Sequence, residues 1–159
     1  MIYTIGHSNH TMEHFIELLK IYEIDTIVEV RSVPNSRYSK HFDIHNLIKE
    51  LRKHSINYID MGKILGGRPF DNSVLNSSNE IELEIIEQRK WYDNGIKRLI
   101  ELSNKFKIAI MCSEENPAIC HRGYIITHSL LKRGIEVIHI RGDKSYQKAI
   151  FFERQGHLF

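Results

Sequence analysis

The most constraining feature of the sequence is the apolar run KIAIM at residues 107–111. A run this short and this apolar is typical of a strand that is buried on both faces of a parallel sheet. The alternation of strands and helices along the chain predicts a single three-layer α/β domain over residues 1–159, in which a mainly parallel sheet of about five strands is flanked by helices. The other strands are predicted at residues 2–5, 26–30, 56–61 and 135–140.

Between the strands, apolar residues at helical spacing and residues that favour helix ends predict the helices. Residues 80–104 have a helical composition, and Asn94-Gly95 in their middle predicts a turn between two helices. Asn116-Pro117 favours a helix start, and Gly134 favours the end of the same helix. Residues 62–79 are rich in Gly, Asn and Ser, which predicts a loop longer than the usual connection of about 4–6 residues.

Composition and charge exclude several classes of protein. No stretch approaches the roughly 20 apolar residues of a membrane-spanning helix, so no membrane association is expected. The 22 Lys and Arg residues nearly balance the 20 Asp and Glu residues, which argues against a surface that wraps nucleic acid but not against a local anion-binding pocket. The first residues lack the basic start and the cleavage site of a signal peptide, so we expect a cytoplasmic protein with reduced cysteines.

Polar clusters directly follow three of the predicted strands. Because the carboxyl ends of parallel strands meet at one edge of a sheet, these clusters are expected to converge and to form a ligand site. His7, Arg31, Cys112 and Arg122 should therefore meet at that edge. The clusters are GHSN at residues 6–9, RSVPNSR at residues 31–37, and CSEENPAICHR at residues 112–122.

Cys112 is the first candidate for a reactive group, because it lies between a buried strand and a helix start. The backbone N–H groups of that helix, together with His121 and Arg122, would favour its thiolate form. The alternative is that Cys112 is a small buried residue that closes the strand. The same two alternatives apply to Cys120, which either packs in the core or acts as a second reactive thiol.

Acidic and basic side chains of the same clusters complete the candidate site. Glu114 is a candidate general acid or base if the site desolvates it, and otherwise an exposed carboxylate beside a helix start. Arg31 and Arg37 flank a turn and are able to grip a phosphate or carboxylate, or to form surface salt bridges. The predicted catalytic residues are Cys112, Glu114, His7 and His121, and the predicted substrate-binding residues are Ser8, Asn9, Arg31, Ser32, Arg37, Arg68 and Arg122.

A metal site is not expected from the spacing of the cysteines, and no cofactor is predicted. Cys112, Cys120 and His121 are three potential zinc ligands, but seven residues separate the thiols, unlike the common CxxC pattern. An adjacent Cys and His also rarely point at one ion. His10 and His14 lie one helical turn apart, without an evident third ligand nearby.

Several motifs together resemble the DUF488 family, a domain of unknown function. The resemblance extends from Thr4 to Ile140 and implies a small cytoplasmic α/β domain, without assigning it a reaction. Glu29 departs from the aspartate that the family usually has before Val-Arg, but it keeps the charge. The motifs are TIGHSN at residues 4–9, EVRSVP at residues 29–34 followed by Ser36-Arg37, LGGR at residues 65–68, and CSE at residues 112–114 with CHR at residues 120–122.

A weaker similarity links the chain to rhodanese-like domains, in which a strand runs into Asp-Val-Arg and a later strand ends at the active cysteine. Cys112 occupies the place of that cysteine. The loop from Cys112 to Arg122 is longer than the rhodanese loop and lacks its glycines. The similarity therefore implies the architecture and not the activity.

These residues favour an enzyme, of the hydrolase or transferase type, that acts on a phosphate-bearing substrate such as a nucleotide or a modified nucleic acid. A noncatalytic module that binds a nucleotide or a nucleic-acid end would use the same arginines but would need neither the thiol nor Glu114. A redox or sulfur-transfer protein would instead use Cys112 and Cys120. The expected partner in the first two cases is an anionic small molecule, a nucleotide or nucleic acid.

Overall fold

The strand β4 (Ile108–Cys112) lies inside the sheet between β2 and β1, and all five of its residues are buried. The computed structural model describes residues 1–151, so residues 152–159 of the predicted domain lie outside the described part. Within residues 1–151, six strands form one sheet in the order β3-β2-β4-β1-β5-β6, and only the pair of β5 and β6 is antiparallel. The other strands are β1 (Ile2–Gly6), β2 (Thr26–Glu29), β3 (Asn57–Asp60), β5 (Val137–Ile140) and β6 (Tyr146–Lys148).

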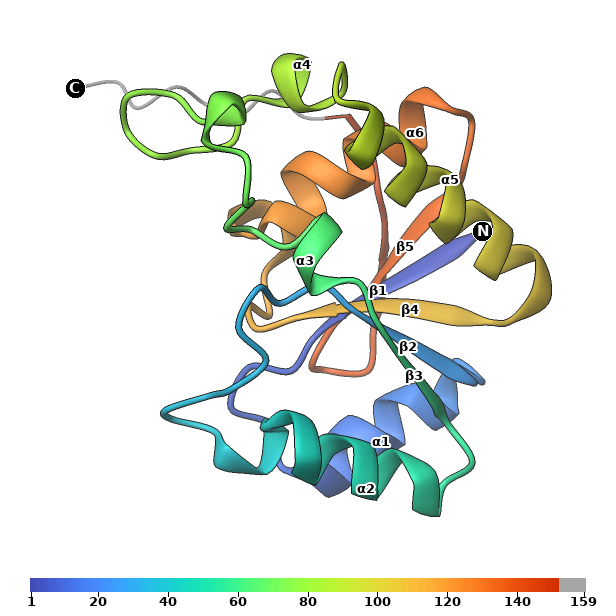
Figure 1. Ribbon diagram of the computed structural model, residues 1–159. Helices are drawn as coiled ribbons and strands as arrows, with labels where there is room; N and C mark the ends of the chain where they lie inside the picture. Colours follow the sequence, from blue (N-terminus) through green and yellow to red (C-terminus); the bar gives the residue numbers. More distant parts are fainter. Residues whose placement is uncertain (152–159) are drawn as a thin grey trace.

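Helices cover both faces of the sheet, so the predicted three-layer α/β class is confirmed (Figure 1). In this view α1 (Met12–Ile21) and α2 (Ile44–Lys53) lie below the sheet, and α5 (Lys90–Lys105) and α6 (His128–Lys132) lie above it. None of the helices within residues 1–151 is long and apolar enough to cross a membrane. The shorter helical segments are α3 (Gly62–Leu65), α4 (Leu83–Ile86), the 3-10 helices η1 (Lys40–Phe42), η2 (Asn72–Val74) and η3 (Pro117–Ile119), and the π-helix η4 (Arg122–Thr127).

Alternate residues of β4 pack into two separate cores, because successive side chains of a strand point to opposite faces of the sheet. Ala109 and Met111 pack in the core that α1 and α2 close. Ile108 and Ile110 pack in the core that contains the buried residues of α5 and η4. The apolar run that predicts a doubly buried strand therefore supplies both cores at once.

The antiparallel edge strand β6 is the element that the sequence did not predict. All three of its residues are exposed, so it carries no alternation of apolar and polar residues that would indicate a buried face. It forms because the chain turns back after β5, where Arg141 donates its backbone N–H to the carbonyl of Ser145. Backbone pairing alone decides such a strand, and composition does not reveal it.

The predicted turn at Asn94-Gly95 is wrong, because α5 runs without a break through both residues. The two helices of this region, α4 and α5, are instead separated at residues 87–89. Gly95 is buried against α3, where an added Cβ atom would lie 2.7 Å from Cγ2 of Ile64. The glycine therefore allows two helices to approach each other and does not end a helix.

The predicted long loop and the predicted last helix are also more finely divided than the sequence indicated. The loop of residues 62–79 contains α3 and η2, and Leu75 forms an isolated bridge with Ile81. The segment of residues 116–134 begins as the 3-10 helix η3, continues as the π-helix η4 and ends as α6. A π-helix is rare and often lies beside a functional site.

We predict that Gly95→Val lowers the free energy of unfolding by about 1–3 kcal/mol, because the new side chain overpacks the contact between α5 and α3. The measurement is urea unfolding at equilibrium. Asn94→Val is the matched control, since it places the same β-branched residue on the exposed side of the same helix. Equal stabilities of the two variants would contradict the packing role of Gly95.

Candidate functional site

The loops after β1, β2 and β4 emerge at the same edge of the sheet, on the left in Figure 1. Gly6 and Cys112 are register partners at the ends of β1 and β4, and the backbone of Val30 bonds to the carbonyl of Met111. A cavity of about 790 Å³ opens at this edge, a size within the roughly 300–1,000 Å³ of small-molecule sites. The predicted site residues that line it are Arg31, Ser32, Arg37, Arg68, Cys112, Glu114 and His121.

Two thiols and an imidazole form a compact cluster in the wall of this cavity. The Sγ atoms of Cys112 and Cys120 lie 3.8 and 3.9 Å from Nδ1 of His121, and the three atoms are all within 4.8 Å of one another. All three residues are buried, and the most exposed of them, His121, is only 8 % exposed. The sequence-based expectation that adjacent Cys120 and His121 would point apart is wrong.

The irregular backbone explains this convergence. Cys120 has extended dihedral angles directly after η3, whereas His121 has helical angles directly before η4. The backbone therefore changes conformation between the two residues, and both side chains reach Cys112. Cys120 was not among the predicted catalytic residues, and its adjacency to His121 was the available signal.

The pKa values of the two thiols are shifted in opposite directions. A hydrogen bond from the Cys112 thiol lowers the pKa of Cys120, and the nearby guanidinium of Arg122 lowers it further. The same hydrogen bond and burial raise the pKa of Cys112. The cluster therefore favours a thiolate on Cys120 and a thiol on Cys112, whereas the sequence had pointed to a thiolate on Cys112.

Arg31 is held in place by a buried ion pair with Glu29. Its Nε and one terminal nitrogen donate to the two carboxylate oxygens of Glu29 at 2.8 and 2.7 Å, and Tyr58 donates to the same carboxylate at 2.9 Å. Glu29 is fully buried and Arg31 is 4 % exposed. Arg31 thus presents a rigid, largely neutralised guanidinium to the cavity.

His7 lies behind Arg31 and not in the lining of the cavity. Its Nδ1 hydrogen-bonds to the carbonyl of Ser8, so its Nε2 accepts from the other terminal nitrogen of Arg31 at 3.3 Å. Burial lowers the pKa of His7 to about 4, and the ring is therefore neutral near pH 7. In this position His7 supports Arg31 from outside the cavity lining, and its predicted catalytic role stays a prediction.

Arg122 is fully buried, and its guanidinium bonds to the loop after β4 and to β1. It donates to the backbone carbonyls of Glu114 and Glu115, and its Nε donates to Oγ1 of Thr4 at 3.2 Å. These bonds tie the loop after β4 to β1 and to the start of η4. Arg122 is not among the residues that line the cavity, so its predicted contact with a substrate stays a prediction.

Arg37 and Arg68 are the exposed guanidinium groups at the cavity. Within residues 1–151 no carboxylate pairs with either side chain, so both remain available to a ligand. Ser32 fixes the loop that carries Arg68, since its Oγ accepts the backbone N–H of Arg68 at 2.9 Å. Gly67 approaches the ring of His121 so closely that a Cβ atom there would lie 2.9 Å from Nδ1.

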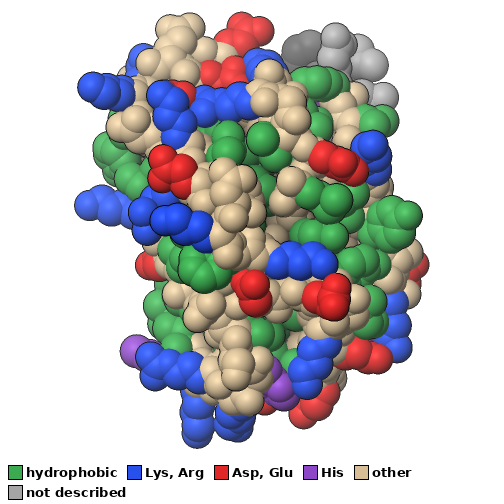
Figure 2. Space-filling view, turned by 90° about the vertical axis from the view of Figure 1, so that its right-hand side faces the viewer, with side chains coloured by type: hydrophobic (Ala, Val, Ile, Leu, Met, Phe, Trp, Pro, Cys, Tyr) green, Lys and Arg blue, Asp and Glu red, His purple; other side chains and the backbone are tan. Residues whose placement is uncertain are grey.

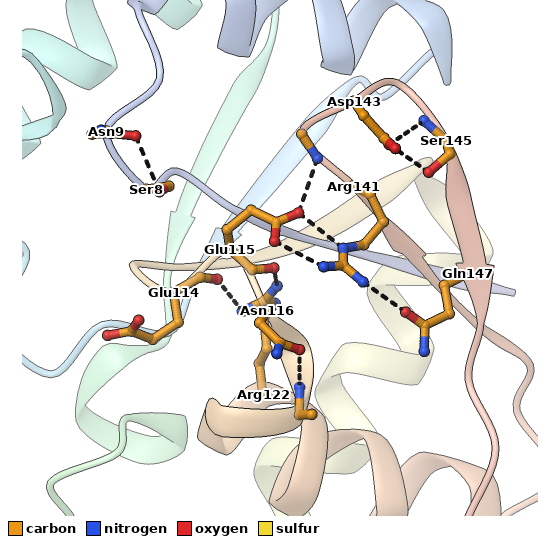
Figure 3. Close-up of polar contacts among 12 residues, drawn as sticks. Ser8, Asn9, Glu114, Glu115, Asn116, Arg122, Arg141, Asp143, Ser145 and Gln147 are labelled. Atoms are coloured by element: carbon orange, nitrogen blue, oxygen red, sulfur yellow. Dashed lines mark hydrogen bonds and ion pairs between the residues drawn. The ribbon is translucent and has the colours of Figure 1, made fainter.

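The remaining predicted residues lie on the loops around this site. Ser8 and Asn9 bond to each other on the loop after β1 and are outside the cavity lining (Figure 3). In the same view the carboxylate of Glu114 points away from Arg122 and Arg141, and Glu114 lines the cavity. The predicted substrate contacts of Ser8 and Asn9 therefore find no support in this arrangement.

Comparison with protein families identifies a relationship over most of the chain. The model of the domain of unknown function DUF488 matches residues 11–128. The chain belongs to the DUF488 family. No curated protein and no solved structure matches the chain significantly.

The matched DUF488 segment contains most of the site. It includes the loop after β2, the Gly-Gly-Arg loop and the whole segment from Cys112 to Arg122, whereas residues 4–9 precede it. Glu29, which departs from the aspartate expected of DUF488, forms the bidentate pair with Arg31. The longer carboxylate is thus fully accommodated in this chain.

We predict that Glu29→Gln lowers the free energy of unfolding by about 3 kcal/mol or more, because it leaves the charge of Arg31 buried without its partner. Glu29→Asp keeps the charge and should lose less. The control is Glu23→Gln, which removes an exposed pair with Lys107 and should change stability by at most about 1 kcal/mol. Urea unfolding measures all three, and a Glu29→Gln protein as stable as the native one would refute the role of this pair.

We also predict a pH-dependent contribution from Glu115, which lies beside Glu114 and accepts two hydrogen bonds from Arg141 (Figure 3). Arg141 lowers the pKa of Glu115 from 4.5 to about 2. A lowered pKa in the folded state stabilises the protein above the unfolded value, and this contribution disappears as the pH falls from about 4.5 to about 2.

Thermal unfolding of Glu115→Gln against pH measures this effect. The variant should be less stable than the native protein near pH 7, by about 1 kcal/mol or less because the pair is partly exposed, and the two should converge in acid. Glu114→Gln is the control, since within residues 1–151 Glu114 forms no ion pair. A difference that stays constant with pH would contradict the ion-pair origin.

Proposed function

We propose that this DUF488 protein is an enzyme that acts on a phosphate-bearing substrate, such as a nucleotide or the end of a modified nucleic acid. The observation that carries the proposal is that one cavity contains three arginines and, in its wall, the cluster of Cys112, Cys120 and His121. Cationic groups that bind an anion and groups capable of chemistry are thereby combined in one site.

The arginines support the phosphate-binding part of the proposal. Guanidinium groups bind phosphate oxygens through paired hydrogen bonds, and Arg37 and Arg68 are exposed and available for such bonds. Arg31 is oriented in advance by Glu29, so it loses little freedom when a ligand binds. Phosphate is favoured over a larger polyanion because the unpaired guanidinium groups of Arg37 and Arg68 lie together in one cavity.

The charge distribution on the opposite face also supports a small anion over an extended one. Figure 2 shows the opposite end of the sheet, where the N-terminus lies, and basic and acidic side chains are interspersed over that face. The net charge of the chain is only +2. Nucleic-acid binding along an extended surface is therefore disfavoured, whereas binding of a single nucleotide or strand end is not.

Apolar side chains beside the arginines support a nucleotide over a bare phosphate. Val33 and Ile119 line the cavity and are 56 % and 66 % exposed, and the ring of Tyr124 lines it as well. Such side chains contribute contact area to a base or a sugar. Phosphate at the arginines and a base at this apolar rim would occupy the cavity together.

The proposed reactive end of the cavity is the thiol–imidazole cluster, and Glu114, which lines the same cavity, is the proposed group for proton transfer. The cluster requires reduced sulfur atoms, which fits the expected cytoplasmic location. A noncatalytic nucleotide-binding module and a rhodanese-like sulfur-transfer protein remain the alternatives, and the tests below separate them.

The binding test is a thermal shift with nucleotides, inorganic phosphate and the matched nucleosides. We predict that nucleotides raise the melting temperature and that nucleosides do not, because a ligand stabilises the native state only when it binds. Arg37→Ala and Arg68→Ala should each weaken binding about tenfold. Arg98→Ala, an exposed arginine on α5, is the control that should bind normally; failure of every phosphate-bearing ligand to bind would refute the proposal.

The catalytic test measures product from each ligand that binds. Cys120→Ser and Glu114→Gln should lower turnover while binding is largely retained. Binding without any product would favour a noncatalytic binding module over an enzyme. A persulfide on Cys112 or Cys120, detected by mass spectrometry after exposure to a sulfur donor, would instead favour sulfur transfer.

A further inference from the structure

We propose that Cys112, Cys120 and His121 bind a zinc ion whose fourth coordination position opens into the cavity. The two sulfur atoms and Nδ1 of His121 are the three donors. The presence of zinc does not depend on which substrate the cavity accepts.

The distances fit a tetrahedral ion. With Zn–S bonds of about 2.3 Å and Zn–N bonds of about 2.0–2.1 Å, a tetrahedral site places sulfur and nitrogen donors about 3.6 Å apart and two sulfur donors about 3.8 Å apart. The S–N distances here are 3.8 and 3.9 Å, and no pair among the three atoms exceeds 4.8 Å. Small side-chain movements therefore suffice to complete the coordination.

The orientation of His121 is a second, independent observation. Its Nε2 lies 3.1 Å from the carbonyl oxygen of Val30, which only accepts hydrogen bonds, so Nε2 carries the proton of the neutral ring. Nδ1 then directs its lone pair toward the two sulfur atoms. A backbone carbonyl that fixes the tautomer in this way is the usual support of a metal-binding histidine.

The donor types select the metal. Thiolate and imidazole ligands favour zinc over magnesium, calcium or manganese, which prefer oxygen. Two thiolates and a neutral imidazole also balance the double charge of zinc, which removes the cost of leaving charged sulfur atoms buried. Gly67 leaves open the space beside Nδ1 that a side chain would occupy.

The number of protein ligands indicates a reactive site rather than a structural one. Structural zinc sites have four protein ligands, whereas catalytic sites have three and keep a position for water. All three ligands line the cavity together with Arg37 and Arg68, so a water molecule from the cavity is able to complete the coordination.

The role of this zinc ion in the reaction rests on the proposed function. Zinc lowers the pKa of a bound water to about 7, so the site would supply hydroxide next to the bound phosphate. The hydroxide oxygen would bond to phosphorus, the bond from phosphorus to the leaving oxygen would break, and the leaving oxygen would take the water proton through Glu114. The cysteines would then be ligands and not nucleophiles.

The test uses cobalt as a spectroscopic probe of the full chain, stripped with a chelator and kept reduced. Titration with Co²⁺ should produce a thiolate-to-cobalt charge-transfer band and the visible bands of a tetrahedral site, with saturation at one ion per chain. Zinc should displace the cobalt. Cys112→Ser, Cys120→Ser and His121→Gln should each weaken cobalt binding at least about tenfold.

Two controls show that the cluster itself is responsible. His45→Gln changes an exposed histidine of α2, and Glu114→Gln changes a carboxylate of the same cavity, and both should bind cobalt normally. Circular dichroism checks the folding of each variant. Because the ligands are buried, the native chain provides a second measurement: zinc should protect both thiols from alkylation, and a chelator should reverse this protection.

The outcomes distinguish this inference from the proposed function. A native chain that gives no charge-transfer band, or a folded Cys120→Ser protein that keeps the full band, would overturn the zinc site. Nucleotide binding through Arg37 and Arg68 without a cobalt band would overturn the zinc site alone. A cobalt band without any binding of a phosphate-bearing ligand would overturn the proposed function alone.

Discussion

The buried guanidinium of Arg122 is the interaction on which the site depends. A fully buried charge needs hydrogen-bond partners and a compensating charge. The carbonyls of Glu114 and Glu115 and the hydroxyl of Thr4 provide the hydrogen bonds, and the positive charge of Arg122 in turn helps to lower the pKa of the Cys120 thiol. Arg122 therefore joins the loop after β4, the strand β1 and the start of η4, and it stabilises the anionic form of the sulfur cluster.

Four arginines near this edge of the sheet have divided roles. Arg122 and Arg31 are buried, and each donates several hydrogen bonds to the protein. Arg37 and Arg68 are exposed at the cavity. The cavity therefore presents two free guanidinium groups and the rigid edge of Arg31, while the fully buried Arg122 keeps the loop in place.

The fold was predictable where burial leaves a pattern in the sequence. The strand β4 is recognisable because both of its faces are buried, and the helices α1 and α2 because one face of each is buried. The strand β6 has no buried face, and Gly95 looks like a helix breaker until its contact with α3 is known. The strand β6 depends on backbone pairing with β5, and Gly95 depends on packing against a helix that is distant in the sequence.

The sequence by itself determined that the polar clusters after β1, β2 and β4 meet, because parallel strands end at one edge of their sheet. The tertiary structure alone decided which side chains of those clusters face the cavity. Arg122 and Arg37 look equivalent in the sequence, yet one is sealed and the other is exposed. Cys120 and His121 converge on Cys112 because the backbone passes from an extended residue into a π-helix, and such an irregular path gives no fixed relation between sequence spacing and side-chain direction.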